Sequence, residues 1–362
     1  MKVILSCGGT GGHIYPAIAI ADKIKEKDPD AKILFIGTKT GMENRLVPAA
    51  GYDIKGIDAS GFKRTHLYKN IETLHNIRLG GKEAEKIIKD FSPDVVIGTG
   101  AYVTGVVLLH AHKLGIPTVI HEQNALPGLT NKIVSRFADR VFVSFKGTEN
   151  VFHHPERVVY SGNPIRSDFA KLDRASARAE LGLNDSDLVV LATGGSLGAE
   201  ILNREVVDFA SKIKDVNIKL LFVTGKRYYD EVKSRCDYPG VKVIDYANNM
   251  PVLMSASDMI VSRAGAIALA EIMACGKPSI LIPSPNVTNN HQYHNAKALA
   301  DEGAAVLIEE KDLAEGEGVL SAEILSLMAR PEDLSSMAIR AKGLATIDAA
   351  DIIFDNLVLN KA

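Results

Sequence analysis

Three glycine-rich turns in the sequence offer places where a ligand could approach the backbone. Residues 8–12, 98–105 and 194–198 each hold several glycines, and each follows a short run rich in β-branched residues. Bare backbone N–H groups at the start of a helix attract anions, so such a turn can hold a diphosphate without a side-chain cation. The alternative is that glycine only makes a tight turn in a packed domain. Residues 3–12 and 189–198 align without a gap, which favours ligand binding by a matched pair of turns.

The turns do not match the common nucleotide fingerprints. A dinucleotide-binding fold needs G-x-G-x-x-G, but Ile14 and Val103 occupy the positions where the third glycine would fall after Gly9 and Gly98. The sequence also contains no G-x-x-x-x-G-K-[ST] motif. These patterns exclude a dinucleotide-dependent enzyme and a P-loop nucleotidase.

Two groups of polar residues in the first half could transfer a proton. His13 closes the first glycine turn, and a histidine whose pKa is near the ordinary value of about 6.5 can accept a hydroxyl proton at neutral pH. His121, Glu122 and Asn124 directly follow a predicted strand, at the edge where open α/β sheets bind their ligands. We name His13 and Glu122 as catalytic candidates. The alternative to a catalytic role is that His13 or His121 is a buried core residue or a helix cap.

The second half carries two further candidates. Glu271 lies on a predicted helix beside Ile267 and Ile272, where a carboxylate is costly unless it has a partner, and two ribose hydroxyls would serve. A solvent-facing glutamate is the alternative. His291 and Asn295 are four residues apart and would share one face of a helix. Because no third metal ligand has a useful spacing, we expect a sugar or phosphate there and no metal site.

Short β-branched runs alternate with helical periodicity along the whole chain, which is the pattern of βα units on parallel sheets. At about 150 residues per domain, the 362 residues favour two domains. We place one domain at 1–162, a second at 163–341, and a helix at 342–362 that packs back on the first domain. The predicted strands are 2–6, 32–37, 94–98, 117–121, 140–144 and 158–160, then 188–193, 219–224, 241–245, 259–262, 279–283 and 305–308.

The net charge of −2 conceals a basic half and an acidic half. Residues 1–165 hold 21 basic and 16 acidic side chains, a net charge of +5. Residues 166–362 hold 21 basic and 28 acidic side chains, a net charge of −7. The chain as a whole therefore has no general attraction to nucleic acid.

One segment of the basic half is typical of a membrane surface. Residues 63–78 combine apolar side chains at helical spacing with several cations, as interfacial segments do. A core helix with a basic outer face is the alternative. The longest apolar stretch, 95–109, is broken by glycine and threonine and is too short to span a bilayer. The residues expected on the membrane surface are Lys63, Arg64, Lys69, Ile71, Leu74, Ile77 and Arg78.

Six motifs occur in the order seen in one known family. They are residues 8–13, 100–105, 121–124 with Asn131, 162–166, 194–196 and 263–271. On these motifs the sequence resembles the MurG family of N-acetylglucosaminyltransferases of peptidoglycan synthesis. The resemblance implies a GT-B fold, in which two Rossmann-like, doubly wound parallel-sheet domains face a central cleft. It also implies inverting, metal-independent transfer of N-acetylglucosamine from UDP-N-acetylglucosamine to the muramyl 4-hydroxyl of lipid I, the undecaprenyl-diphosphate-linked muramyl pentapeptide, giving lipid II without a cofactor.

The resemblance also assigns roles by position. His13 would be the base at the acceptor, Glu271 would bind the ribose hydroxyls, and the Ala247 backbone would recognise uracil. The implied donor-binding set is Thr10, Gly11, Gly12, His13, Asn124, Arg166, Ser196, Ala247, Ala266, Ile267, Ala268, Glu271 and Gln292. The implied acceptor or phosphate set is Gly100, Ala101, Tyr102, Thr104, Asn131, His291 and Asn295. Leu197, Ala101 and Ala268 depart from the residues usual at their positions, so we expect backbone N–H groups to make more of the phosphate contacts.

The resemblance implies a peripheral protein on the cytoplasmic side of the cell membrane. Its implied partners are the two substrates, an anionic membrane surface, and proteins of cell-envelope synthesis and division, but no nucleic acid. A UDP-N-acetylglucosamine 2-epimerase, or another GT-B transferase with a lipid-linked acceptor, could share the fold. A non-catalytic nucleotide-sugar-binding module could share the glycine turns, although ionisable residues clustered at strand ends argue against it.

Overall fold

The protein comprises two α/β units. A computed structural model describes residues 1–59, 70–195, 197–214 and 216–357, and of residues 70–77 it describes the backbone alone. One unit is Met1–Ile165 together with the segment that begins at Asp348, and the other is Arg166–Ile347. The sequence placed these boundaries after residues 162 and 341. A boundary after 341 would cut helix α15 (Pro331–Leu344), which packs against α11 of the second unit.

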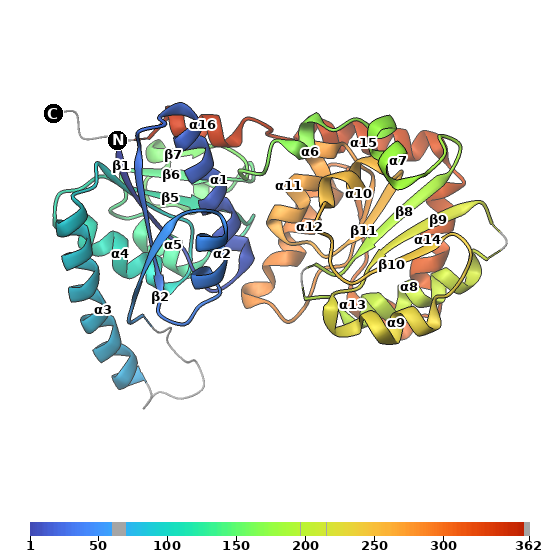
Figure 1. The fold of residues 1–362 in the computed structure, drawn as a ribbon, viewed down its shortest axis with the longest axis horizontal. Coiled ribbons are helices and arrows are strands. Elements are labelled where there is room, and N and C mark those ends of the chain that lie inside the picture. The colour runs from blue at the N-terminus through green and yellow to red at the C-terminus, as the bar shows by residue number, and fades with distance from the viewer. Residues whose placement is uncertain (60–69, 196, 215, 358–362) are drawn as a thin grey trace. The chain divides into compact units, whose positions relative to one another are not determined.

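The first unit is a seven-stranded parallel sheet with helices on both faces (Figure 1). The strand order is β3-β2-β1-β4-β5-β6-β7. Successive residues of a strand point to opposite faces, so Ile4 packs with α3 and α4, whereas Val3 and Leu5 pack with α1, α2 and α16. Its strands are β1 (Lys2–Ser6), β2 (Lys32–Thr38), β3 (Asp53–Ile57), β4 (Val95–Gly98), β5 (Thr118–Glu122), β6 (Arg140–Val143) and β7 (Val158–Tyr160). Its helices are α1 (Gly11–Lys27), α2 (Glu43–Ala49), α3 (Asn70–Phe91), α4 (Tyr102–Lys113), α5 (Leu129–Val134) and α16 (Ala349–Asp355), with short 3-10 turns at Glu149–Val151 and Pro155–Arg157.

The second unit is a six-stranded parallel sheet in the order β10-β9-β8-β11-β12-β13. Val190 and Ala192 of β8 pack into a core with α8 and α14. Its strands are β8 (Leu188–Thr193), β9 (Ile218–Val223), β10 (Val241–Ile244), β11 (Met259–Ser262), β12 (Ser279–Leu281) and β13 (Ala305–Leu307). Its helices are α6 (Asp168–Lys171), α7 (Arg174–Leu181), α8 (Glu200–Lys212), α9 (Tyr229–Arg235), α10 (Met250–Ala256), α11 (Ala266–Cys275), α12 (His291–Asp301), α13 (Glu310–Glu315), α14 (Val319–Met328) and α15, with 3-10 turns at Lys226–Tyr228 and Thr288–Asn290.

These two parallel-sheet units confirm the predicted fold class. The inner strands of both sheets are almost continuous runs of buried residues, mostly Val, Ile and Leu, as expected where helices cover both faces of a sheet. One strand, β3, escaped prediction because Lys55 and Gly56 interrupt its apolar pattern. It lies at the edge of the first sheet, where one side of the strand has no neighbouring strand and its residues are only partly buried.

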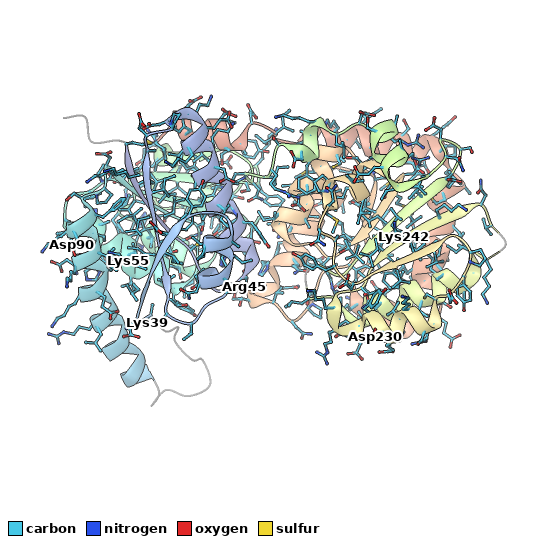
Figure 2. The ribbon with its side chains drawn as sticks, in the orientation of Figure 1. Lys39, Arg45, Lys55, Asp90, Asp230 and Lys242 are labelled. Carbon is cyan, nitrogen blue, oxygen red and sulfur yellow. The ribbon has the colours of Figure 1, made fainter. Side chains whose placement is uncertain are left out.

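An ion-pair cluster joins the region of this edge to α3. Lys39 lies just after β2 (Figure 2). Its ammonium lies 2.5 Å from the Asp58 carboxylate and 2.9 Å from that of Glu83. All three side chains are exposed, so the cluster contributes little to the free energy of unfolding.

The last described helix, α16, packs against α1 within the first unit. Ile353 is buried in the core beside α1, and Asp351 forms ion pairs with Lys23 at 3.1 Å and Lys27 at 2.9 Å. No helix among the described residues has both the length and the apolar character needed to cross a bilayer.

Candidate active site

In each unit, turns expected to bind ligands lie where the strand order reverses. In the first sheet β1 and β4 are neighbours, and the chain leaves β1 toward β2 but leaves β4 toward β5. In the second sheet β8 and β11 are neighbours in the same relation. Ligands of open α/β sheets bind outside the carboxyl ends of the strands at such a switch point. The turns at 8–12, 98–105 and 194–198 and the turn before α11 all follow these four strands.

Three helices begin at these switch points without a side-chain cap at their N-termini. The N-cap residues of α1, α4 and α11 are Thr10, Ala101 and Gly265, and none of them accepts a hydrogen bond through its side chain. None of the three helices has an acidic residue in its first turn. Because side chains do not cap these termini, each can attract an anion such as a phosphate.

His13 lies in the first turn of α1, and hydrogen bonds hold both its ring and its backbone carbonyl. Nδ1 lies 3.1 Å from the Gly8 carbonyl, which can only accept, so Nδ1 carries a proton and Nε2 is the ring nitrogen that can take up another. The Thr99 hydroxyl donates to the His13 carbonyl at 2.7 Å. Gly100, at φ +126°, admits the ring closely, since a Cβ there would lie 2.6 Å from Cδ2. The fold thus fixes both the tautomer and the position of His13.

Glu122, at the end of β5, organises the loop that follows it. Its Oε1 accepts hydrogen bonds from the backbone and side-chain nitrogens of Asn124 at 2.9 and 3.1 Å. Its Oε2 accepts from Gly128 N at 2.9 Å and from Asn131 Nδ2 at 2.8 Å. The side chain is 1% exposed. In this arrangement four donors occupy the carboxylate, so its role is to hold the loop 123–131.

His121 is fully buried one residue earlier. Its Nε2 donates to the Gly162 carbonyl at 3.0 Å, and its Nδ1 accepts from Gln123 Nε2 at 3.0 Å. Burial lowers the pKa of the imidazole to about 4, so the ring is neutral near pH 7 with both nitrogens engaged. This arrangement disfavours His121 as a catalytic base.

The middle turn places its expected acceptor residues in different environments. Tyr102 is 51% exposed, whereas the Thr104 hydroxyl is buried 2.6 Å from the Gly100 carbonyl and 3.0 Å from that of Ser6. Thr104 therefore braces the start of α4 from inside the core. Ala101 has φ +75° and ψ 167°, a backbone conformation that is essentially restricted to glycine. Asn131, also expected here, is 3% exposed and faces Glu122.

In the second unit, Glu271 lies on α11 with Ala266, Ile267 and Ala268 in the turn before it. The residue is partly exposed, but protein surrounds its carboxyl, and this burial raises the pKa to about 8 while the charge of Arg166 opposes the rise. Arg166 is exposed, and its guanidinium carbon lies 5.4 Å from the centre of the Phe169 ring. The partly exposed Glu271 residue and the exposed Arg166 guanidinium together suit a ligand that brings both hydroxyl donors and negative charge.

The start of α12 braces the same switch point. Gln292 Oε1 accepts from Ser284 N at 2.9 Å, which fixes the loop after β12. Asn295 is fully buried and its Nδ2 donates to the Ala264 carbonyl at 3.3 Å, so it supports the turn before α11. His291 Nδ1 lies 2.9 Å from the Thr288 carbonyl. Ala247, expected at uracil, is half-buried just after β10.

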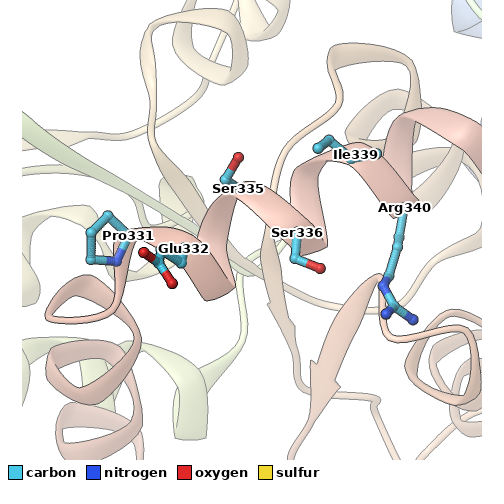
Figure 3. Close-up of a pocket in the computed structure, with 6 residues that line it drawn as sticks. All are labelled: Pro331, Glu332, Ser335, Ser336, Ile339 and Arg340. Atoms are coloured by element: carbon cyan, nitrogen blue, oxygen red, sulfur yellow. The ribbon is translucent and has the colours of Figure 1, made fainter.

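Two hollows mark the surface of the second unit. One of about 470 Å³ is lined by Asn203 of α8, Tyr228, Arg263 after β11 and Asn286 after β12, so it opens at the carboxyl edge of the sheet. The other, of about 530 Å³, is lined by one face of α15 (Figure 3). No residue at a strand end lines the α15 hollow, and it has no part in the proposed chemistry.

Several expected residues lie outside the described part of the chain. These are Ser196, Lys63, Arg64 and Lys69, and the side chains of Ile71, Leu74 and Ile77. Arg78 is exposed on α3. Across residues 1–59, 70–195, 197–214 and 216–357, no three His, Cys, Asp or Glu side chains gather as a metal ion would require.

Sequence reasoning missed two residues that the fold brings to the first switch point. Thr99 holds the His13 carbonyl, as described above. Glu43, at the start of α2, is fully buried against Gly8, where a Cβ would lie 3.0 Å from Glu43 Oε1. Thr99 lies in the glycine turn 98–105, but its contact with His13, like that of Glu43 with Gly8, joins segments far apart in the chain.

Comparison with known proteins identifies a family. Residues 3–143 match the glycosyltransferase family 28 N-terminal domain, and residues 189–353 match the glycosyltransferase family 28 C-terminal domain. The chain is 46% identical, over 100% of both chains, to the UDP-N-acetylglucosamine--N-acetylmuramyl-(pentapeptide) pyrophosphoryl-undecaprenol N-acetylglucosamine transferase of Acetivibrio thermocellus. It is 47% identical to the protein of the same name from Alkaliphilus oremlandii, over 99% of this chain and 98% of that one.

Solved structures agree with this relationship. MurG of Acinetobacter baumannii superposes with a TM-score of 0.80 at 28% identity, over 98% of this chain and 99% of that one. The UDP-GlcNAc 2-epimerase of Neisseria meningitidis superposes with a TM-score of 0.68 at 16% identity, over 98% and 99%, and shows a shared fold alone. The chain therefore belongs to glycosyltransferase family 28, and within it to the MurG family.

Proposed function

We propose that this protein transfers N-acetylglucosamine from UDP-N-acetylglucosamine to the muramyl 4-hydroxyl of lipid I, giving lipid II. The observation that carries the proposal is His13, held by the Gly8 carbonyl at the switch point of the first sheet with Nε2 able to accept a proton. The full-length relatives bear the name of this transferase, which supports the same substrates here. No cofactor is needed for the reaction, since the sugar nucleotide is a substrate.

The proposed reaction is a direct displacement with inversion. His13 Nε2 takes the proton of the acceptor hydroxyl as the oxygen forms a bond to the anomeric carbon. The bond from that carbon to the UDP oxygen breaks, and UDP leaves with the bonding electron pair. The glycine turns and the start of α11 offer N–H groups that stabilise the charge on the leaving diphosphate, so this scheme uses no metal ion.

Glu122 has a positioning role in this scheme. Its two oxygens already accept four hydrogen bonds, and moving a proton to it would break part of the loop it holds. That loop carries Asn124, which we expect at the donor, and Asn131, which we expect at the acceptor. The geometry therefore favours His13 over Glu122 as the base.

The donor is proposed to bind the second unit. Glu271 would accept hydrogen bonds from the ribose hydroxyls, Arg166 would face the diphosphate, and the Ala247 backbone would meet uracil. The first turn of α11 and Gln292 would contact the phosphates and sugar. The support is their common position at the carboxyl edge of the second sheet.

We also propose that α3, α4 and α5 form a membrane-facing surface on the cytoplasmic side of the cell membrane. Helix α4 packs closely against α5, since a Cβ on Gly105 of α4 would lie 3.0 Å from Thr130 of α5. It also packs closely against α3, since a Cβ on Gly81 of α3 would lie 2.4 Å from His110 of α4. The face of α4 between these contacts includes Tyr102 and Leu109. The apolar side chains exposed on the three helices are Leu79, Tyr102, Leu109, Leu129 and Ile133, and the exposed cations include Arg78, Lys82, Lys113 and Arg136. Exposed apolar side chains together with exposed cations suit an anionic bilayer, where proteins of cell-envelope synthesis and division would also be met.

The His13→Ala variant tests the proposed base. We expect kcat for UDP release with a short-chain lipid I to fall by about 10²- to 10⁴-fold. The Kd for UDP-N-acetylglucosamine should change by less than about twofold, because most of the proposed donor contacts belong to the other unit. Turnover by His13→Ala at the wild-type rate would contradict the role of His13.

The 2-epimerase and the binding module make different predictions. An epimerase would convert UDP-N-acetylglucosamine without any acceptor, and a binding module would release no UDP in its presence. The transferase requires UDP release that depends on lipid I, and it should prefer UDP-N-acetylglucosamine to other UDP- and TDP-sugars.

A further inference from the structure

A buried carboxylate lies behind the glycine turn that fixes His13. Glu43 is 0% exposed at the start of α2. Its Oε1 accepts hydrogen bonds from Thr38 N at 2.8 Å and from Thr38 Oγ1 at 2.6 Å. Its Oε2 is buried and has no hydrogen-bond partner among the described residues. A buried polar atom without a partner costs stability, so folding alone does not explain this side chain.

Glycines from separate segments leave the space that Glu43 occupies. A Cβ on Gly41 would lie 2.1 Å from Oε2, and one on Gly37 would lie 2.6 Å from Cγ of Glu43. A Cβ on Gly8, across from β2 in the neighbouring turn, would lie 3.0 Å from Oε1. The Glu43 carboxyl group therefore fills the volume between the turn after β2 and the turn after β1.

The Gly8 peptide connects this volume to the proposed catalytic base. The Gly8 carbonyl accepts from His13 Nδ1 at 3.1 Å and from Thr10 N at 3.0 Å. Its position decides which ring nitrogen of His13 carries the proton. If the space behind Gly8 were empty, the turn could relax and the carbonyl would no longer select one tautomer.

We propose that Glu43 is a positioning residue for His13: held by Thr38, it supports the Gly8 turn and so keeps His13 Nδ1 protonated and Nε2 able to accept the acceptor proton. The proposal rests on the role of His13 given above. It assigns the effect to the shape of the side chain and to the acceptor Oε1, because the second oxygen makes no hydrogen bond with the described residues.

This assignment predicts an order among variants of Glu43. Glu43→Gln keeps the length and an oxygen for Thr38, so its kcat should stay within about threefold of wild type. Glu43→Ala empties the space, and Glu43→Asp withdraws the carboxylate by one methylene, so both should lose about 10- to 100-fold in kcat, as orienting partners of catalytic groups do. The KM for UDP-N-acetylglucosamine should change by less than about twofold in all three.

Two further variants separate positioning from general stability. Gly41 does not have a positive φ, so its backbone conformation is open to alanine. The new Cβ of Gly41→Ala would displace the Glu43 carboxylate. The kcat of this variant should therefore fall as in Glu43→Ala. Glu83→Gln is the matched control, because Glu83 also accepts a backbone N–H, from Asp58 at 2.8 Å, in the same unit. Its kcat should equal that of wild type.

The decisive readout is the tautomer of His13, which does not depend on turnover. In protein labelled with ¹⁵N-histidine, the His13 signals, assigned by their loss in His13→Gln, should show protonated Nδ1 and unprotonated Nε2 at pH 8 in wild type and Glu43→Gln. Glu43→Ala and Gly41→Ala should show a mixture of tautomers. The proposal is overturned if the tautomer is unchanged in Glu43→Ala, or if Glu43→Asp is fully active while Glu43→Gln is not. If His13→Ala keeps its turnover, the proposed base fails, whereas the tautomer still reports on Glu43.

Discussion

The pKa of Glu271 leads to a testable dependence of donor binding on pH. Burial raises the pKa of this carboxyl to about 8, and Arg166 opposes the rise. Ribose hydroxyls donate hydrogen bonds, so they favour the ionised carboxylate and binding should lower its pKa. Affinity for the donor should therefore weaken as the pH falls below 8, where the free protein holds the carboxyl protonated.

The magnitude follows from the fraction of protein that is competent to bind. If only the ionised form binds, the apparent Kd is multiplied by the inverse of the ionised fraction, which is about 0.9 at pH 9 and about 0.01 at pH 6 for a pKa of about 8. The Kd for UDP-N-acetylglucosamine should rise about 90-fold over this range. The ligand itself contributes little, because its doubly esterified diphosphate does not titrate there.

Isothermal titration calorimetry at several pH values measures this dependence, and buffers of different ionisation enthalpy report proton release on binding. Glu271→Gln should bind the donor more weakly than wild type at pH 9 and should lose most of the pH dependence. The dependence that remains is assigned to Lys277, because burial lowers the pKa of this side chain to about 8, in the same range. A wild-type Kd that stays constant from pH 6 to 9, or a Glu271→Gln variant with the full dependence, would refute the assignment of Glu271 to the donor.

Three other predictions concern stability and membrane binding. Ala101→Gly relieves a glycine-only backbone conformation. After the entropy cost of glycine is subtracted, the free energy of unfolding of the first unit should rise by about 1 kcal/mol in a urea titration. A loss of stability would contradict the strain at Ala101. Arg178 is 1% exposed, with its guanidinium 2.7 Å from Asp258, so Arg178→Ala should lower the thermal midpoint of the second unit, at a cost of about 3–5 kcal/mol, and an unchanged midpoint would count against this. Replacing Leu129 and Ile133 by Asp should weaken sedimentation with anionic vesicles at least tenfold, at unchanged donor affinity; undiminished vesicle binding would remove α5 from the membrane surface.

The fold was largely predictable because its signals are local. A run of buried apolar residues followed by a glycine turn and an amphipathic segment is visible within about 30 residues. The strand order is not visible at this range, because right-handed βα connections only limit the possible arrangements. Strand β3 was the exception, since its Lys55 and Gly56 belong to an edge strand that is only partly buried.

The position of the candidate residues at the ends of strands was predictable, but the surroundings of each side chain were not. His13 and Glu122 both follow strands at the switch point, and sequence spacing treats them alike. Only the fold shows that Glu122 accepts four hydrogen bonds, whereas the Gly8 carbonyl orients the His13 ring through Nδ1. Thr104 and Asn295, expected at the ligand, are buried supports, because a side chain's direction depends on neighbours distant in sequence.

Glu43 is a candidate residue that the sequence does not reveal. Its volume is defined by glycines from different turns, and nothing near it in the sequence marks it as part of the site. A residue of this kind can be found only after the two turns are placed side by side by the β1 and β2 pairing.

The central claim is that this chain joins N-acetylglucosamine to the lipid-linked muramyl pentapeptide. Incubating the protein with UDP-N-acetylglucosamine and a short-chain lipid I, then isolating the product for mass spectrometry and NMR, tests the claim most directly. We predict a disaccharide in which N-acetylglucosamine is β-linked to the muramyl 4-hydroxyl, formed in equal amount with UDP. Recovery of unmodified lipid I, or of a UDP-sugar epimerised at C2, would contradict it.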